Sequence, residues 1–256
     1  MQKIAITAKL CIIGDFMENL THVGDFKTNG NIRVSDPCYD KKTWCSGKIK
    51  VKPGKYRAYI KCGDIDNWGY RVQSLYIVHE KFKLKDLTFK KTEIDVGVDS
   101  GQCGFFNDEL YKKKLKTPVP LVGHEEYDSR DNLWRAENDS GCNLDLMEKL
   151  LKGTMSDKDF KKYKSDEKKD KAKRLKEAKE RAENIDPEKC KKSNDFYEVC
   201  CSMTLGNLKA GVEDFGVVSS SGFGDGSYDC FVNEGKEVIA SYIEFIGEDE
   251  DEEEED

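Results

Sequence analysis

The chain has 256 residues, of which 37% are hydrophobic and 36% are charged, and its formal net charge is −7 at pH 7. This length is enough for one large β domain or two smaller ones with a buried core. No stretch approaches the roughly 20 apolar residues that a membrane span needs, so we do not expect a membrane protein.

The charge is concentrated in two segments. Residues 157–192 contain 15 Lys or Arg and 10 Asp or Glu, a net charge of +5, and the nine residues 248–256 are all acidic. The remainder carries −3, which is an ordinary value for a globular domain. A run of like charges buries no apolar area, so we expect 248–256 to be a disordered acidic tail.

The N-terminal residues and the cysteines bear on the cellular compartment. The N-terminus alternates like a strand and lacks the continuous apolar segment of a signal peptide. The ten cysteines include no CxxC pair. Both features favour a cytoplasmic protein with reduced thiols, and a secreted, disulfide-bonded protein is the less favoured alternative.

Short β-branched and apolar runs, separated by turns rich in Gly, Pro and Asp, recur along most of the chain. The predicted strands are 3–13, 30–34, 47–51, 55–62, 70–79, 93–98, 196–205, 215–218, 228–232 and 238–246. Pro53-Gly54 between two alternating runs predicts a hairpin of 47–51 with 55–62. This pattern favours an antiparallel β-sandwich or a partly open barrel. Residues 107–141 are irregular and predict no regular element.

A charged helical segment interrupts the strands. Residues 144–151 predict a short amphipathic helix, and Ser156 is a candidate N-cap for a helix over about 157–184, which Pro187 ends. We interpret 144–192 as an insertion into one discontinuous β-rich domain, 1–143 and 193–247. The expected fold class is mainly β, and α+β overall.

Three loops place an Asp next to Gly, Pro, Ser or Cys at the end of a strand. They are 35–39, 99–102 and 222–226. If these strand ends meet, Asp36, Asp99 and Asp225 form one polar cluster. Converging carboxylates suit Mg²⁺ or Ca²⁺ and acid–base chemistry. The alternative is ordinary turn chemistry, because Asp bonds its own backbone and Gly reaches positive φ.

These loops contain the candidate site residues. Candidate metal ligands are Asp36, Asp99 and Asp225. The full set of candidate ligand-binding residues is Asp36, Cys38, Tyr39, Asp99, Ser100, Gln102, Gly224, Asp225, Gly226 and Tyr228. The glycine loop lacks the Lys-Ser/Thr of a P-loop and has no helix after it, which argues against a phosphate cradle. An EF-hand beginning at Asp64 is rejected, because Trp68 and Leu75 occupy ligand positions.

Two further kinds of site are weaker. A Cys-His nucleophile pair would need Cys38 or Cys103 close to a histidine, and buried cysteines are commonly small hydrophobic residues. The basic insertion could bind nucleic acid, but its interspersed acids and lack of an aromatic platform argue against it.

Together the three loops resemble an uncharacterised domain family of bacteria, phages and some eukaryotes. The resemblance lies in Ser35-Asp36-Pro37-Cys38-Tyr39, Val98-Asp99-Ser100-Gly101-Gln102 and 221–228 (Ser-Gly-Phe-Gly-Asp-Gly-Ser-Tyr), with the Pro-Gly turn and 69–72. It covers about 30–106 and 195–246. It implies a compact domain of about this size and no particular reaction.

Three functions follow as hypotheses. The first is a binding or interaction protein whose Asp/Gly loops recognise a small-molecule ligand or a partner protein. The second is a metal-dependent hydrolase that uses Asp36, Asp99 and Asp225. The third is nucleic-acid binding through the basic insertion.

Overall fold

The structure is a computed structural model that describes residues 20–138, 158, 169, 172–173, 175–181 and 183–247. The chain divides into two compact units, Met1–Val119 with Lys192–Asp256, and Pro120–Lys191. The predicted strand 3–13, the predicted helix 144–151, the N-cap at Ser156 and the acidic tail 248–256 lie outside the described residues.

The first unit contains two antiparallel sheets. A six-stranded sheet has the order β1-β4-β5-β13-β12-β6, and a five-stranded sheet has the order β10-β11-β7-β2-β3. The strands of the larger sheet are β1 (Leu20–Thr28), β4 (Gly54–Ile65), β5 (Gly69–His79), β6 (Phe89–Val98), β12 (Gly226–Asn233) and β13 (Ala240–Glu244). Those of the smaller sheet are β2 (Asn31–Ser35), β3 (Gly47–Lys50), β7 (Gln102–Asn107), β10 (Ala210–Glu213) and β11 (Gly216–Ser220).

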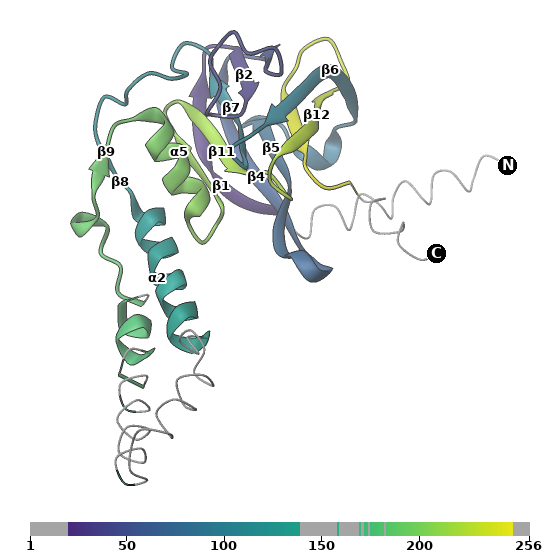
Figure 1. Cartoon of the computed structure of the whole chain (residues 1–256). Helices are drawn as coiled ribbons and strands as arrows, with labels where there is room; N and C mark the ends of the chain where they lie inside the picture. Colours follow the sequence, from purple (N-terminus) through teal and green to yellow (C-terminus); the bar gives the residue numbers. More distant parts are fainter. Residues whose placement is uncertain are drawn as a thin grey trace, which may run out of the picture. The chain divides into compact units, whose positions relative to one another are not determined.

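The mainly antiparallel β architecture expected from the sequence is present. Over the described residues both strand orders are open, so neither sheet closes into a barrel. Figure 1 shows β6 and β12 side by side, in agreement with their antiparallel pairing.

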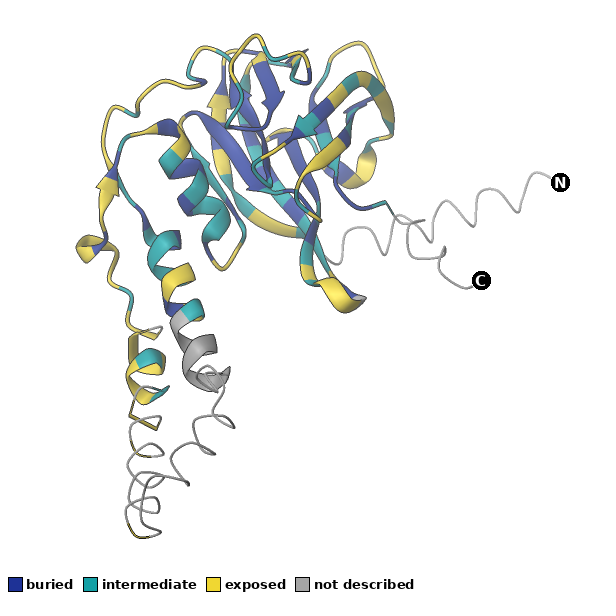
Figure 2. Ribbon diagram, in the orientation of Figure 1, coloured by how far each residue is buried: buried dark blue, intermediate teal, exposed yellow. Residues whose placement is uncertain are grey.

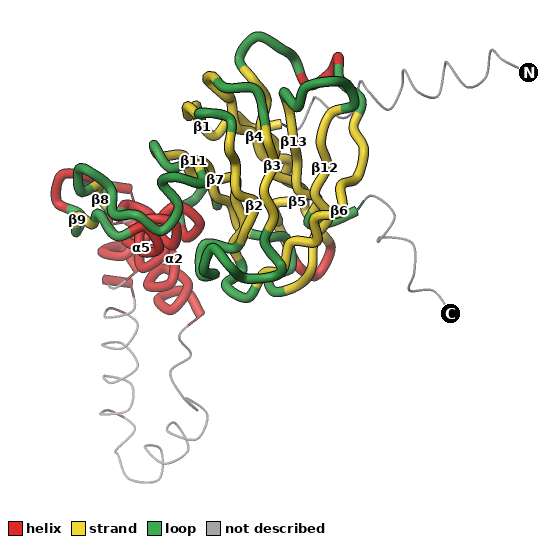
Figure 3. Tube along the Cα trace, turned by 90° about the horizontal axis from the view of Figure 1, so that it is seen from above, coloured by secondary structure: helices red, strands yellow, loops and turns green. Residues whose placement is uncertain are grey.

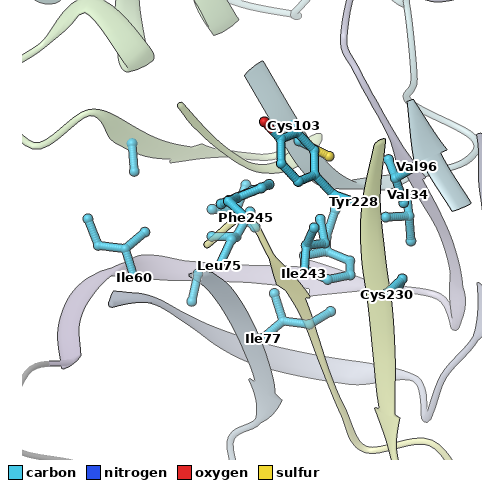
Figure 4. Packing of buried hydrophobic residues seen from close by; sticks show 14 of the residues in the cluster. Val34, Ile60, Leu75, Ile77, Val96, Cys103, Tyr228, Cys230, Ile243 and Phe245 are labelled. Carbon is cyan, nitrogen blue, oxygen red and sulfur yellow. The ribbon is translucent and has the colours of Figure 1, made fainter. Parts of the chain in front are cut away.

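One hydrophobic core takes side chains from both sheets. Val34 and Cys103 from the smaller sheet and Leu75 and Ile243 from the larger one are fully buried and belong to one cluster. Figure 4 shows these side chains close together. Figure 2 shows buried residues along the strands of both sheets. Burying apolar area away from water supplies the main favourable free energy for such a fold.

Strand alternation explains how the chain supplies this core. In β4, Tyr56, Ala58 and Ile60 are buried while their neighbours are partly exposed, as period-2 side chains require. A second, smaller cluster around Tyr76 and Val78 packs with Leu84 and Ala240. Leu84 lies in the short 3₁₀ helix η2 (Leu84–Asp86).

The predicted hairpin at Pro53-Gly54 is wrong. Both strands form, but β3 pairs with β2 in one sheet, and β4 pairs with β1 and β5 in the other. The segment between them therefore carries the chain from sheet to sheet. Backbone hydrogen bonds hold it, from Val51 N to the Gly30 carbonyl at 2.9 Å and from Lys52 N to the Val238 carbonyl at 2.8 Å. A Pro-Gly turn signal predicts a change in chain direction, whereas contacts with strands distant in the sequence decide which strands pair.

The predicted strand 196–205 is also wrong, because these residues form the helix α5 (Phe196–Leu205). The Asp195 side chain caps it by accepting from Glu198 N at 2.9 Å. Phe196, Val199 and Cys200 are buried, which is the spacing of one helix face rather than of a strand. α5 lies beside β11 (Figure 3).

The second unit holds the helix α2 (Val122–Asn138) and the 3₁₀ helix η3 (Pro187–Lys189). α2 corrects the expectation of irregular structure over 107–141. The described residues of the predicted 157–184 helix are helical up to 183. The ion pairs Lys173–Glu177 and Lys176–Glu180, at 3.8 and 3.7 Å, support it.

Three short elements complete the described chain. They are the strands β8 (Val119–Pro120) and β9 (Lys192–Ser193), which pair with each other, and the 3₁₀ helix η1 (Asp66–Trp68). Among the described residues, no helix combines the length and the apolar character needed to cross a membrane.

Candidate functional site

Two of the three motif loops connect the sheets at the same place. β6 ends at Val98 opposite Gly226, where β12 begins. β7 begins at Gln102 opposite Ser220, where β11 ends. The connections 99–101 and 221–225 therefore cross side by side between the sheets.

The third motif loop reaches the same edge through β2. This strand runs beside β7, and its last residue, Ser35, pairs with Gly104. Asp36 follows directly, next to the start of β7. We call residues 36–39, 99–102 and 221–226 the motif edge.

The Asp36 carboxylate joins two loops of the motif edge. Asp36 is fully buried, and its Oδ2 accepts from the backbone N–H groups of Asp99 at 2.9 Å and Ser100 at 2.7 Å. Its Oδ1 accepts from the Ser100 hydroxyl at 2.6 Å and from Cys38 N at 2.7 Å. These four N–H and O–H donors match the four lone-pair positions of a carboxylate. Asp36 therefore has a structural role, and its oxygens are already occupied by hydrogen-bond donors.

The Tyr111 hydroxyl fixes the loop that contains Asp36 by hydrogen bonding. Its buried hydroxyl lies 2.8 Å from the Asp36 carbonyl, 2.7 Å from the Tyr39 carbonyl and 3.1 Å from the Ser35 hydroxyl. Sequence reasoning did not identify Tyr111, because it lies in a segment that predicted no regular element.

The glycine loop is held through its backbone. Ser221 N donates to the Gly101 carbonyl at 3.1 Å, and the Tyr228 hydroxyl lies within hydrogen-bonding distance of the carbonyls of Ser221 and Gly224, at 3.0 and 2.8 Å. A Cβ placed on Gly101 would lie 3.9 Å from the Gly224 Cα, so these two loops adjoin. Tyr228, a candidate ligand residue, is buried and fixes the loop instead.

The structure brings the loops together without directing three carboxylates to one point. Asp36 is buried, whereas Asp99 and Asp225 are exposed. The Tyr39 hydroxyl bonds to the Asp99 carboxylate; burial first, and then this hydrogen bond, raises the pKa of Tyr39. Gly226 is exposed and begins β12. Within the described residues, no group of three His, Cys, Asp or Glu side chains has the arrangement of a metal site.

Cys38 sits beside the buried carboxylate and is only partly buried. Burial, the hydrogen bond to Asp36 and the negative charges of Asp36 and Asp99 raise the pKa of its thiol to about 12. Such a thiol stays protonated at neutral pH and is a poor nucleophile. This argues against Cys38 as the catalytic residue of a thiol enzyme.

Helix α5 supplies residues that the sequence did not assign to the site. Gln102 is buried, and its Nε2 donates to the Cys201 Sγ at 3.4 Å, while its Oε1 has no hydrogen-bond partner among the described residues. Tyr197 bonds to the Ser100 side chain; burial, followed by the nearby Cys201, raises the pKa of Tyr197 to about 12. These contacts were missed because 196–205 predicted a strand.

An exposed aromatic side chain of the motif edge contacts a second exposed aromatic side chain from outside it. Trp68, in η1, is 58% exposed, and Phe223, in the glycine loop, is 39% exposed. Their ring centroids are 5.2 Å apart in an edge-to-face arrangement. The Arg71 guanidinium lies 6.0 Å from the Trp68 ring. We call Trp68 and Phe223 the aromatic pair. Both are large aromatic residues in polar or glycine-rich turns, and this is the sequence signal that could have identified them.

No protein-family model matches this chain, and no curated protein or solved structure matches it significantly. The resemblance described above stays a prediction.

Proposed function

We propose that this chain is a binding protein whose motif edge recognises a partner protein or peptide through the aromatic pair. The observation that carries the proposal is the contact of Trp68 with Phe223, two exposed aromatic side chains from separate loops. Protein interfaces concentrate their binding energy in a few such residues, Trp above all. Contiguous exposed apolar side chains mark interaction sites more often than single exposed apolar residues do.

The ordered loop that carries Phe223 strengthens this interpretation. The glycine loop is closed by the hydrogen bond from Gly224 N to the Ser221 carbonyl at 2.7 Å and by Tyr228. A loop that is already ordered loses little conformational entropy on binding. The role of the buried Asp36 network is to hold this surface in one geometry.

The metal-dependent hydrolase built on Asp36, Asp99 and Asp225 has weaker support. A divalent cation needs carboxylate oxygens with free lone pairs. Those of Asp36 accept four hydrogen bonds, two of them from Ser100 at 2.6 and 2.7 Å. Nucleic-acid binding through the insertion stays a prediction, since most of that segment lies outside the described residues.

Two further proposals concern the packing of the two sheets and the cellular location of the protein. We propose that the two sheets form an antiparallel β-sandwich, a view supported by the single core cluster that they share. We also propose a cytoplasmic location, where the eight free cysteines of the described residues would remain reduced.

Selection from a random peptide library on the immobilised protein tests the binding function. Peptides recovered on the wild-type protein should bind Trp68→Ala and Phe223→Ala at least about tenfold more weakly, the loss typical of interface aromatic residues. Tyr127→Ala is the matched control, because Tyr127 is an aromatic residue that is 47% exposed but belongs to α2 of the second unit. Its affinities should stay within about twofold of wild type, as for a residue outside an interface.

Thermal unfolding of each variant checks that the fold is intact. Peptides that bind all three variants equally well, or a selection that yields no peptide for the wild-type protein, would overturn the proposal.

A further inference from the structure

The described part of the chain ends beside the glycine loop. After β13, the backbone N–H groups of Phe245 and Ile246 donate to the Gln73 carbonyl at 2.8 and 3.1 Å. A Cβ placed on Gly222 would lie 2.9 Å from the Phe245 Cβ and 3.0 Å from the Ile246 Cγ1. The chain therefore leaves the larger sheet in contact with the loop that carries Phe223.

The acidic segment 248–256 starts one residue after this contact. All nine of its residues are Asp or Glu. Nine residues span at most about 30 Å, so whatever path they take, their charges stay within that distance of the glycine loop. A concentration of negative charge raises the local concentration of cationic partners and the rate at which they associate.

Exposed carboxylates also surround the aromatic pair. Asp64 is exposed in the hairpin of β4 and β5, and Asp99 and Asp225 are exposed in two loops of the motif edge. None of the three forms an ion pair with another described residue. Two cations lie nearby. Arg71 is beside the Trp68 ring, and Lys209 contacts a carbonyl at the start of β5. The surface itself is thus weakly acidic, and the segment 248–256 makes the whole edge strongly so.

The aromatic pair can bind cationic side chains as well as apolar ones. Lys and Arg are attracted to the faces of aromatic rings within about 6 Å of the centroid. Arg71 already makes such a contact with Trp68, at 6.0 Å. Tyr70, directly after the turn that carries Trp68, is a third exposed aromatic residue, at 59%. Nucleic acid and acidic peptides would instead be repelled by the negative charge.

We propose that the segment recognised at the aromatic pair is a basic peptide, rich in Lys and Arg, of a partner protein. This inference rests on the proposed binding function and adds the chemistry of the partner. An apolar or aromatic side chain of the peptide packs on Trp68 and Phe223. Its cationic side chains face Asp64, Asp99 and Asp225, and the acidic segment 248–256 attracts the peptide to this edge.

Three peptide libraries test the charge of the partner separately from the binding function. They differ only in a few fixed positions, which are all Arg, all Gln or all Glu, and the remaining positions are random. The best peptides of the Arg library should bind at least about tenfold more tightly than those of the Gln library, and the Glu library should yield none. Binding of the Arg peptides should weaken in Trp68→Ala, which separates it from general attraction between opposite charges.

Peptides from the Gln or Glu library that bind as tightly as the Arg peptides, and still depend on Trp68, would overturn the basic partner and leave the binding function intact. Arg peptides that bind Trp68→Ala as tightly as wild type would overturn the site itself.

Association kinetics of the Arg peptides identify which charges act. Replacing each acid of 248–256 by its amide should slow association at least about tenfold at low salt and leave the dissociation rate within about twofold, as charges at the margin of an interface do. The difference should largely disappear near 1 M salt, where screening acts over about 3 Å. Trp68→Ala should instead accelerate dissociation, because it removes a packed contact.

Two triple variants test the carboxylates of the surface. Asp64→Asn/Asp99→Asn/Asp225→Asn should slow association several-fold, roughly in keeping with the loss of three nearby charges. The matched control, Glu80→Gln/Asp86→Asn/Glu109→Gln, removes three exposed acids beyond the opposite ends of β5 and β7 and should stay within about twofold of wild type. Thermal unfolding checks that each variant is folded. Equal slowing by the two triple variants, or unchanged association when the segment 248–256 is neutralised, would contradict the proposal.

Discussion

The buried Asp36 carboxylate accepts two hydrogen bonds from Ser100, one from its hydroxyl at 2.6 Å and one from its backbone N–H at 2.7 Å. The two residues are 64 positions apart in the sequence. This contact ties the loop after β2 to the connection between the sheets. An isolated buried carboxylate would be costly, and its four donors offset that cost.

Asp36→Asn should destabilise the fold strongly. The amide replaces one acceptor oxygen with an NH₂ group that faces N–H donors, and the hydrogen bonds to a charged acceptor are lost. We expect the free energy of unfolding to fall by about 3 kcal/mol or more, measured by urea denaturation. Asp225→Asn is the control from the same set of motifs. Because Asp225 is exposed, its change should be within about 0.5 kcal/mol. Equal effects of the two substitutions would contradict the structural role of Asp36.

The Cys38 thiol should react slowly despite its partial exposure. With its pKa raised to about 12 by burial, by the hydrogen bond to Asp36 and by the charges of Asp36 and Asp99, little thiolate forms at pH 8. Alkylation by iodoacetamide, followed by peptide mass spectrometry, should be on the order of 10³ slower than for a free thiol such as glutathione. Asp99→Asn removes one negative charge and should accelerate the reaction. Reaction as fast as that of the free thiol would show that the environment is not as described.

Asp108→Asn should destabilise the protein in a pH-dependent way. Asp108 Oδ1 lies 2.9 Å from both Arg33 Nε and Nη2, and Lys48 Nζ lies 2.8 Å from Oδ2. Burial alone would raise the pKa of Asp108, but the hydrogen bonds from Lys48 and Arg33 outweigh it and lower the pKa below 3.8. The substitution leaves the buried Arg33 without its charged partner, so we expect a loss of about 2–4 kcal/mol at pH 6.

The sign of the pH dependence follows from the lowered pKa. The carboxylate contributes its full stability above the unfolded-state pKa, and the contribution disappears as the pH falls through the folded-state pKa. The difference between wild type and Asp108→Asn in urea denaturation should therefore shrink below about pH 4, near the unperturbed pKa of Asp. Glu237→Gln, in the more exposed pair with Lys52, should change stability by at most about 0.5 kcal/mol at pH 6. A difference that stays constant down to pH 2.5 would exclude the ion pair as its cause.

Gly222→Ala should disturb the glycine loop. Gly222 has φ +52°, and a Cβ there would lie 2.9 Å from the Phe245 Cβ. The left-handed conformation costs an L-residue about 1–2 kcal/mol, and the close contact adds to this. We expect a total loss of about 2–3 kcal/mol in urea denaturation. For Gly247→Ala, a Cβ would meet nothing within 4 Å, and the change should be small. Equal stability of the two variants would mean that the loop adopts another conformation.

Local sequence patterns identified most strands of the first unit. The alternation of apolar and polar residues over 55–62 predicted a strand that lies within β4. The pattern over 70–79 predicted β5 almost to its ends. Such patterns are local, because successive side chains of a strand face opposite sides of the sheet. The same reasoning failed at 196–205. Aromatic and β-branched residues there predicted a strand, but these residues form α5, whose N-terminus is capped by the Asp195 side chain.

From the sequence alone it follows that Asp36, Asp99 and the glycine loop occupy the ends of strands, because their residues favour turns. Which strands pair, and therefore which loops adjoin, was decided by contacts between distant segments, such as Gly226 with Val98 and Ser220 with Gln102. The tertiary structure also distinguished three similar aspartates. It buried Asp36 among four donors and left Asp99 and Asp225 exposed, since burial depends on the packing of two sheets and not on the neighbours of each residue in the chain.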